Sequence, residues 1–195
     1  IKQCLANLAP QFNSNRMVME YAERLYYESH VASARLSADS LAEARSLSSH
    51  LRRYREKWGA VRIEDVQTTI GAHVPIRSKV SVAAVVHLGE LVPGEVRCEV
   101  FHGQVNSTGD LVQGRGAEMR HDTSVNLQNG RVRFIGEFPV NRSGRNGFSV
   151  RIIPRDDRLA TPFVSGLITW DVEPDPNLPS TRQIPDFYGA GNVTH

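Results

Sequence analysis

The stretch that decides the fold spans residues 79–88 and reads KVSVAAVVHL. Apolar residues occupy every second position, and the residues between them are mostly small or polar; the alternating positions are Val80, Val82, Ala84, Val86 and Leu88. Successive side chains of a β-strand point to opposite faces, so this spacing predicts a strand with one face buried. The same period of two recurs at residues 96–100 and 148–152. The chain after Gly59 is therefore predicted to be a β-domain.

Turn signals divide this region into about seven expected strands. The predicted strands are residues 61–70, 74–88, 95–105, 117–127, 131–140, 147–153 and 167–172. The dipeptide Asn129-Gly130 lies between two alternating runs and is typical of a hairpin turn. This number of short strands indicates an antiparallel β-sandwich of immunoglobulin-like size. With the helical segment that precedes it, the predicted fold class is α+β by segment.

The sequence before Gly59 has helical spacing instead. One helix is expected within residues 1–9, where Pro10 stops it, and a second within residues 14–28. A third is expected to start at Ser40, because Glu43 follows three residues later in a capping-box pattern. Its apolar residues share one face: Leu41, Ala44, Leu47, Leu51, Tyr54 and Trp58.

The predicted organisation is a helical segment at 1–59, a β-sandwich at 60–172 and a tail at 173–195. The tail is expected to be extended or disordered, because four of the chain's ten prolines fall after residue 171. The sequence starts at Ile1 inside a helical pattern, so we expect the chain to be a piece of a longer protein.

Composition and charge exclude several classes of protein. The 195 residues carry 23 Lys and Arg against 21 Asp and Glu, and this balance argues against nucleic acid as a partner. No apolar run approaches the roughly 18 residues that a membrane span needs, so no membrane association is expected. The two cysteines form no CxxC motif, and no signal peptide is visible. These features favour a reducing, cytoplasmic location.

The usual catalytic and metal-binding patterns are missing from this sequence. Three histidines, His87, His102 and His121, lie on different predicted strands, and scattered surface positions are favoured over a metal site. Cys98 is predicted to be a core residue, and no GxSxG motif is present. We therefore predict no catalytic residue, no metal ligand and no cofactor-binding residue in this chain.

Arginines and glycines concentrate around residues 142–151. Arg142, Arg145 and Arg151 can in principle bind an anion. However, the glycine-rich stretch lies between two strands, whereas a phosphate-binding loop joins a strand to a helix. A turn followed by an exposed strand is the favoured interpretation.

Aromatic side chains can stack on sugar rings if they are exposed. The candidates are Phe163, Trp170, Phe187 and Tyr188. In the alternative interpretation, Phe163 and Trp170 belong to the core and the other two lie in a loose tail. Phe163 and Trp170 are kept as the candidate sugar contacts.

Residues 10–26 read PQFNSNRMVMEYAERLY. This segment resembles the C-terminal helical element of α-glucan (glycogen/maltodextrin) phosphorylases, in particular their shorter bacterial and archaeal branch. Lys2 matches a lysine of the helix that precedes this element in the family. Residues 147–154 and 159–170, and the HLGEL stretch at 87–91, resemble the extra C-terminal domain of the same branch. The resemblance covers about residues 1–170.

The resemblance implies a parent glycosyltransferase of the GT-B fold. Such a parent carries pyridoxal phosphate on a lysine and transfers glucosyl units between α-1,4-glucan and phosphate. The family's cofactor lysine follows a Gly-Thr-Ser-Gly-Met motif that is absent here. No catalytic residue can therefore be carried over, and the chain alone is expected to be catalytically silent.

The resemblance also implies partners. The helices would pack on the upstream catalytic domains of the parent, and the sandwich would be structural or help to hold α-glucan. Without the upstream domains, exposed apolar helix faces are expected to drive self-association. Two alternatives stay open, a stand-alone carbohydrate-binding module and a protein-interaction β-sandwich.

Overall fold

The computed structural model describes residues 2–3, 13–69, 74–159, 161–171 and 181–184. The helix predicted within residues 1–9 lies almost wholly outside the described residues. The chain divides into two compact units, which are treated separately below. The first comprises Ile1–Arg52 and Asp157–Ala160, and the second comprises Arg53–Asp156 and Thr161–His195.

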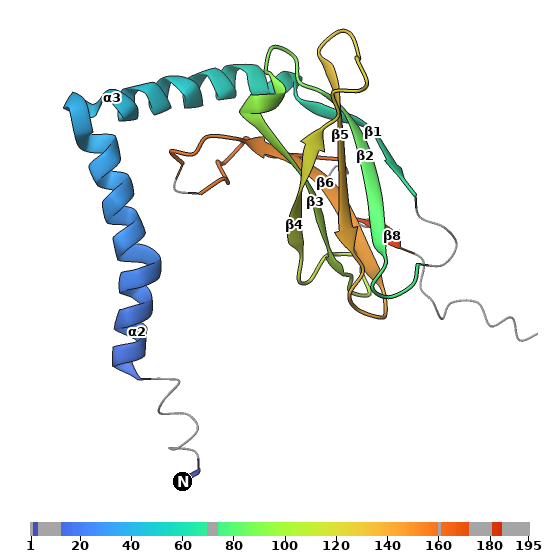
Figure 1. Cartoon of the computed structure of the whole chain (residues 1–195), viewed down its shortest axis with the longest axis horizontal. Helices are drawn as coiled ribbons and strands as arrows, with labels where there is room; N and C mark the ends of the chain where they lie inside the picture. The colour runs from blue at the N-terminus through green and yellow to red at the C-terminus, as the bar shows by residue number, and fades with distance from the viewer. Residues whose placement is uncertain (1, 4–12, 70–73, 160, 172–180, 185–195) are drawn as a thin grey trace, which may run out of the picture. The chain divides into compact units, whose positions relative to one another are not determined.

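The first unit is helical. Helix α2 (Ser14–Tyr21) continues through a π-helical turn (Ala22–Tyr26) into α3 (Tyr27–Lys57) (Figure 1). The second helix therefore runs on well beyond the predicted end at residue 28. Asn13 caps α2, since its side chain accepts a hydrogen bond of 2.8 Å from the Arg16 amide. The cap lies just before the predicted start of this helix at residue 14.

A kink interrupts α3 where the third helix is predicted to begin. Ala38 leaves the helical region, and Asp39, Ser40 and Leu41 have positive φ angles of 47°, 55° and 66°. Glu43 does not form the predicted capping box with Ser40. Its carboxylate instead accepts a hydrogen bond of 2.7 Å from Arg35, on the other side of the kink.

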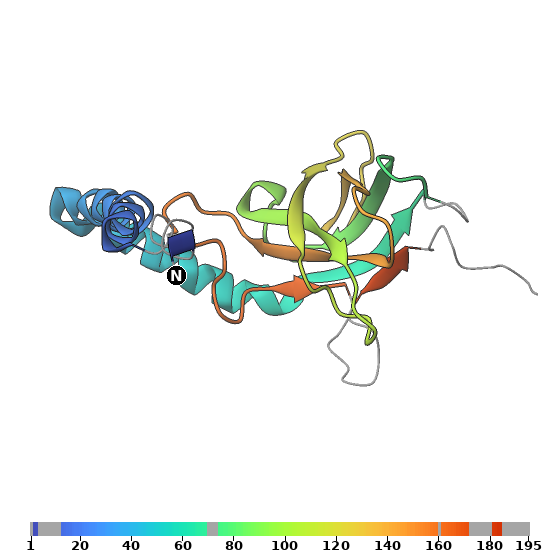
Figure 2. The same cartoon turned by 90° about the horizontal axis from the view of Figure 1, so that it is seen from below.

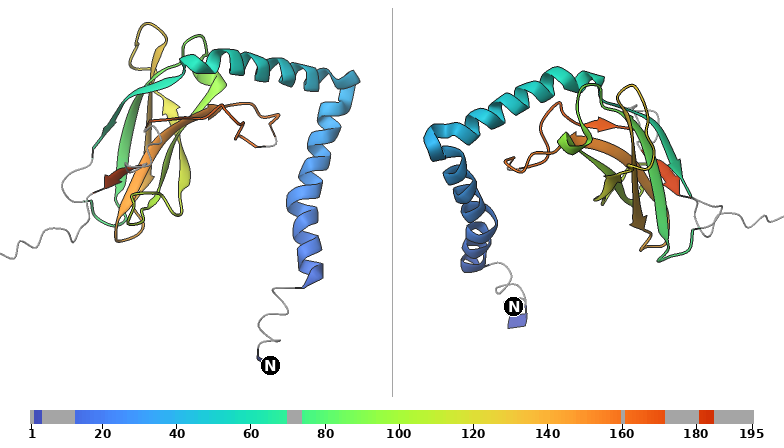
Figure 3. Two further views of the ribbon diagram at one scale, coloured as in Figure 1. Left: turned by 180° about the vertical axis from the view of Figure 1, so that it is seen from behind. Right: turned by 45° about the horizontal axis from the view of Figure 1, so that its top comes forward.

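The second unit is a single antiparallel sheet in the described part of the chain. Its strands are β1 (Arg62–Thr68), β2 (Lys79–His87), β3 (Val96–Gln104), β4 (Arg115–His121), β5 (Arg131–Pro139), β6 (Asn146–Pro154), β7 (Thr169–Trp170) and β8 (Arg182–Ile184). They are arranged in the order β1-β2-β5-β4-β3-β6-β7, and β8 also pairs with β6. Figures 2 and 3 show the red β8 beside the orange β6.

The sheet folds over on itself at β4. Arg120 and His121 of β4 pair with β5, whereas its earlier residues pair with β3. The two halves therefore face each other and enclose the core. Phe138 of β5 lies between His102 of β3, at 4.5 Å between ring centroids, and Phe148 of β6, at 5.5 Å. The predicted fold class is confirmed, with the sandwich bent until it is nearly a barrel.

The predicted alternation of residues 80–88 is confirmed. Val80 and Val82 are 2% exposed, and Ala84 and Val86 are fully buried. The strand itself begins later than predicted, at Lys79 instead of residue 74. A turn occupies the preceding residues, where Arg77 has a φ of 68° and the Ser78 hydroxyl donates to the Pro75 carbonyl.

Other boundaries also differ from the prediction, most of all the end of β4. The strand β4 ends at His121, because the side chain of Asp122 accepts hydrogen bonds from the amide and hydroxyl of Ser124 and starts a loop. Asn129 and Gly130 form the expected left-handed turn, with φ angles of 63° and 71°, but at the end of that loop. In the tail, Arg182–Ile184 is extended and paired with β6, and Phe187 and Tyr188 lie outside the described residues.

The end of α3 belongs to the second unit and is anchored to it. The Tyr54 hydroxyl lies 2.9 Å from the Glu95 carbonyl oxygen and 3.1 Å from that of Arg155. The Tyr54 ring meets Trp58 edge to face, with centroids 6.2 Å apart. Both side chains are buried, so the last two apolar residues of the predicted helix face do pack.

Candidate functional site

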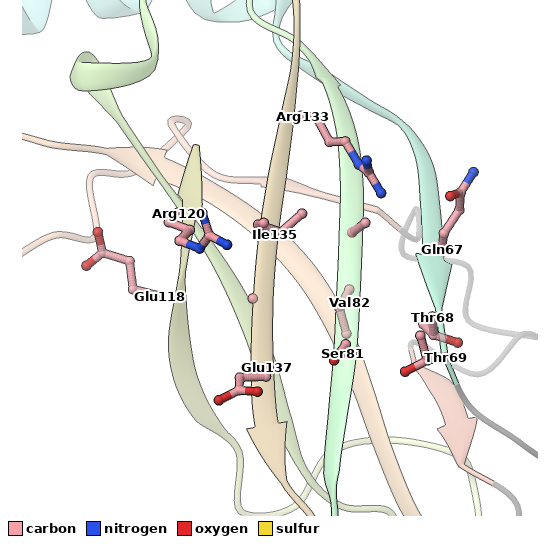
Figure 4. Close-up of a pocket in the computed structure, with 12 residues that line it drawn as sticks. Gln67, Thr68, Thr69, Ser81, Val82, Glu118, Arg120, Arg133, Ile135 and Glu137 are labelled. Carbon is pink, nitrogen blue, oxygen red and sulfur yellow. The ribbon is translucent and has the colours of Figure 1, made fainter. Parts of the chain in front are cut away.

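A groove crosses the outward face of β1, β2, β5 and β4 and has a volume of about 720 Å³ (Figure 4). We call it the outer groove. Its lining residues are Gln67, Thr68, Thr69, Ser81, Val82, Ala83, Glu118, Arg120, Arg133, Ile135, Gly136 and Glu137. The volume lies within the range of about 300–1,000 Å³ that is common for small-molecule sites.

The register of the strands explains the shape of the outer groove. Ala83 of β2 is paired with Gln67 on one side and with Ile135 on the other, so a small side chain sits between two longer ones. Ser81 similarly lies beside Glu137. Small side chains therefore form the floor of the groove, and longer polar side chains surround this floor, as Figure 4 shows.

Most charged groups around the outer groove are already paired. Arg133 lies 3.5 Å from Asp122, Glu118 lies 3.7 Å from Arg97, and Glu137 pairs with Lys79. The hydrogen bonds from Ser124, assisted by Arg133, hold the pKa of Asp122 below its usual range. Asp122 therefore stays ionised near neutral pH and keeps its attraction for Arg133.

Two arginines and two glutamates balance each other in the lining of the outer groove. Guanidinium, carboxylate and amide groups can all hydrogen-bond to hydroxyl groups of an uncharged ligand. The lining contains no cysteine, histidine or aspartate that could act beside a nucleophile. The outer groove is therefore suited to binding a neutral polar molecule.

The predicted sugar contacts Phe163 and Trp170 come together elsewhere, around Arg151. The guanidinium carbon of Arg151 lies 4.6 Å from the ring centroid of Phe101, 4.9 Å from that of Phe163 and 5.4 Å from that of Trp170. We call these four residues the Arg151 cluster. Trp170 also meets Phe101 edge to face at 5.8 Å, and the Phe163 side is open, since that residue is 48% exposed.

Arg151 is held by a buried carboxylate. Its Nε and Nη2 atoms donate to one oxygen of Glu99 at 2.9 and 2.7 Å, and both residues are less than 10% exposed. Gly116 makes room for this pair, because a Cβ there would lie 2.8 Å from the Glu99 carboxylate. The sequence interpretation of residues 147–153 as an exposed strand is wrong, since β6 is buried on both faces.

The candidate metal-binding histidines do not converge. His87 lies 3.0 Å from the Ala60 carbonyl oxygen, His102 stacks on Phe138, and His121 lies beside a different phenylalanine, Phe134. Among the residues that the structure describes, no group of three or more His, Cys, Asp or Glu is arranged to hold a metal ion.

The Cys98 thiol is buried, which raises its pKa far above the usual value. No helix in the described ranges is long and apolar enough to cross a membrane.

Comparison with known proteins shows what class of domain this is. The family model of the glycogen phosphorylase C-terminal domain matches residues 58–173, which cover the last turn of the helical segment and the sheet through β7. The chain belongs to this family. The match confirms the resemblance seen in the sequence.

Relatives match over most of this chain. The glycogen phosphorylase of Mycobacterium tuberculosis strain H37Rv is 29% identical over 170 residues, and that of Mycobacterium bovis has the same identity. The maltodextrin phosphorylase of Thermococcus litoralis is 27% identical over 176 residues. Each alignment covers 87% of this chain but 20% of the relative, so the chain spans about a fifth of the relatives' length.

A lysine-bound pyridoxal phosphate, which the resemblance implies for the parent, does not fit the lysines of this chain. Lys57 lies 2.7 Å from the Glu90 carboxylate, Lys79 pairs with Glu137, and Lys2 is exposed. None of the three lines the outer groove. We assign no cofactor chemistry to these residues.

Removing the buried carboxylate should destabilise the second unit. We expect Glu99→Gln to lower the free energy of unfolding by about 3–5 kcal/mol, because it leaves the Arg151 charge buried without a partner. Urea denaturation of the full chain measures this change. Glu118→Gln is the matched control, since Glu118 is an exposed ion-pair partner and its loss should cost at most about 1 kcal/mol. Equal costs for the two variants would show that the Glu99–Arg151 pair does not stabilise the fold.

Proposed function

We propose that this chain is the non-catalytic C-terminal part of an α-glucan phosphorylase. The parent enzyme would transfer glucosyl units between α-1,4-glucan and phosphate, using pyridoxal phosphate held by upstream domains. The observation that carries this proposal is the family match over residues 58–173. It is supported by relatives named glycogen phosphorylase and maltodextrin phosphorylase, which align with most of this chain. The cytoplasmic location stays a prediction.

We further propose that the second unit helps to hold the glucan. Phe163 is the sugar-stacking residue in this proposal, because its ring is 48% exposed and the Arg151 guanidinium supports it from one side. Trp170 supports the same cluster from a half-buried position. The outer groove, with its balanced charges, offers a second surface for hydroxyl groups. A purely structural role is the alternative.

The parent activity is tested with the full-length gene product. Incubation with maltodextrin, inorganic phosphate and pyridoxal phosphate is expected to release glucose 1-phosphate, whereas the 195-residue chain alone should release none. An inactive full-length protein that has demonstrably bound the cofactor would contradict α-1,4-glucan as the substrate. Absence of both activity and bound cofactor would contradict the proposed parent reaction itself.

Glucan holding is tested by co-sedimentation of the 195-residue chain with glycogen. We expect Phe163→Ala to reduce the sedimented fraction severalfold and Phe163→Trp to retain it, because stacking needs a flat ring. Ala83→Phe fills the floor of the outer groove, and Val85→Phe is its control on the same strand outside the lining. If Ala83→Phe alone reduces the sedimented fraction, the sugar contact lies in the outer groove and not at Phe163. No sedimentation of the unmodified chain would leave the structural role.

We also propose that the isolated chain self-associates through its first unit. The helical apolar side chains there are exposed, with exposed fractions of 48% for Met17, 58% for Val18 and 54% for Leu25. Exposed apolar surface favours association when its partner domain is missing. Light scattering should give a mass above 21.7 kDa that rises with concentration. Changing these three residues to Ser should restore the monomer, and a monodisperse monomer of the unmodified chain at high concentration would contradict the proposal.

A further inference from the structure

A second hollow lies at one end of the sheet and has a volume of about 410 Å³. We call it the end pocket. It is built where β3 ends, β4 begins, β5 ends and β6 begins, so residues from two separate loops meet there. Gly103 permits this meeting, because a Cβ at that position would lie 2.5 Å from the Gln113 carbonyl oxygen.

The lining of the end pocket has positive charge and no negative charge. It contains Arg115 and Arg142 together with His102, and none of its residues is an aspartate or glutamate. Asp110, in the loop that precedes β4, is turned to its own loop, where the Thr108 hydroxyl donates to it at 2.7 Å. The end pocket thus differs from the outer groove, whose lining has as many carboxylates as guanidinium groups.

Amide side chains add hydrogen-bond donors to this charge. Arg142 donates to the side-chain carbonyl oxygens of Gln104 at 3.2 Å and Gln113 at 3.4 Å. These contacts engage the glutamine oxygens and leave the donors of both NH₂ groups for other partners. The Arg115 side chain is exposed and has no hydrogen-bond or ion-pair partner within the described residues, so its guanidinium is available.

His102 forms the inner wall of the end pocket. Its ring stacks on Phe138, with an interplanar angle of 24°, and the residue is partly buried. Burial, with a further contribution from the charge of Arg115, holds the pKa of His102 below its usual value. The imidazole is therefore neutral near pH 7 in the absence of an anion.

From this arrangement we propose that the end pocket binds the phosphate group of a small phosphate monoester. Arginine guanidinium groups match phosphate oxygens in charge and geometry, and two arginines line this pocket, whose lining has no carboxylate. The glutamine NH₂ groups and the His102 ring supply further donors to the same oxygens. The site lies wholly within the second unit, so it does not depend on the proposed phosphorylase activity.

The test is an NMR titration of the histidine side chains in the full 195-residue chain. Inorganic phosphate and glucose 1-phosphate are the two probes, added at constant ionic strength with sodium chloride as the reference. Saturable shifts of the His102 imidazole are expected with both probes, and the resonance is assigned from its loss in His102→Asn. A bound dianion favours the imidazolium, so the pKa of His102 should rise on binding.

Two arginine variants make the result specific. Arg115→Gln should weaken binding by about tenfold or more, because it removes a charged hydrogen-bond donor. Arg131→Gln is the control, since it removes the same charge from an exposed position of the same sheet outside both the end pocket and the outer groove, and it should leave binding unchanged. Arg142→Gln is a second variant in the site, to be used if Arg115→Gln loses its dispersed spectrum.

Three results would overturn the proposal. The first is an absence of saturable shifts, and the second is equal weakening by Arg115→Gln and Arg131→Gln, which would indicate nonspecific screening. The third is binding of inorganic phosphate without glucose 1-phosphate, which would leave a site for a free anion and contradict the monoester. None of these results would alter the outcome of the phosphorolysis or glycogen experiments.

Discussion

The fold of the second unit depends on β4, because this strand is hydrogen-bonded to both halves of the sheet. This strand pairs with β3 along its first five residues and with β5 at its last two. Gly136 of β5 allows the close approach, because a Cβ there would lie 2.8 Å from the Met119 side chain. A larger residue would push the strands apart where the sheet bends. The bend in turn places Phe138 against both His102 and Phe148, and so closes the core.

This closure also decides where the outward-facing side chains go. Glu99 of β3 and Glu118 of β4 are directly paired, so both carboxylates lie on the outward face. Glu118 lines the outer groove, while Glu99 holds Arg151 beneath the aromatic rings. Arg97 lies within 3.9 Å of each of them and connects the two sites. The exposed ion pairs of this network add little to the free energy of unfolding. Disruption of the buried Glu99–Arg151 pair is expected to lower it most.

The sequence predicted the sheet well because most of its strands bury one face. Within residues 80–88 the larger apolar side chains recur at every second position, and this pattern indicated a strand and its inward side. Strand β6 was harder, because it is buried on both faces and its charged residue has a partner 52 positions away. Nothing local distinguishes Arg151 from a solvent-exposed arginine. Strand β8 was missed because it lies among prolines and is only three residues long.

Both hollows depend on pairs of residues that are distant in the sequence. The sequence singled out Arg142 as a residue able to bind an anion, but it had no means of placing Arg115, 27 positions earlier, beside the same pocket. For the same reason the low floor of the outer groove was invisible, since Ala83 is ordinary until Gln67 and Ile135 flank it. The sequence singled out Phe163 and Trp170 for their aromatic rings and Arg151 for its charge, but it did not indicate that Arg151 lies against both rings.

The two hollows differ in charge, and this difference separates the ligands that each can accept. In the outer groove, carboxylates stand beside the guanidinium groups, so a phosphate would meet repulsion as well as attraction. Hydroxyl groups carry no net charge and suit such a mixed lining. In the end pocket an uncharged ligand would leave two arginine charges without compensation, whereas an anion neutralises them. Because a bound anion also favours the protonated imidazole of His102, anion affinity should increase as the pH falls through the pKa of that residue. The lining of the outer groove contains no histidine, so sugar binding there should not depend on pH in this way.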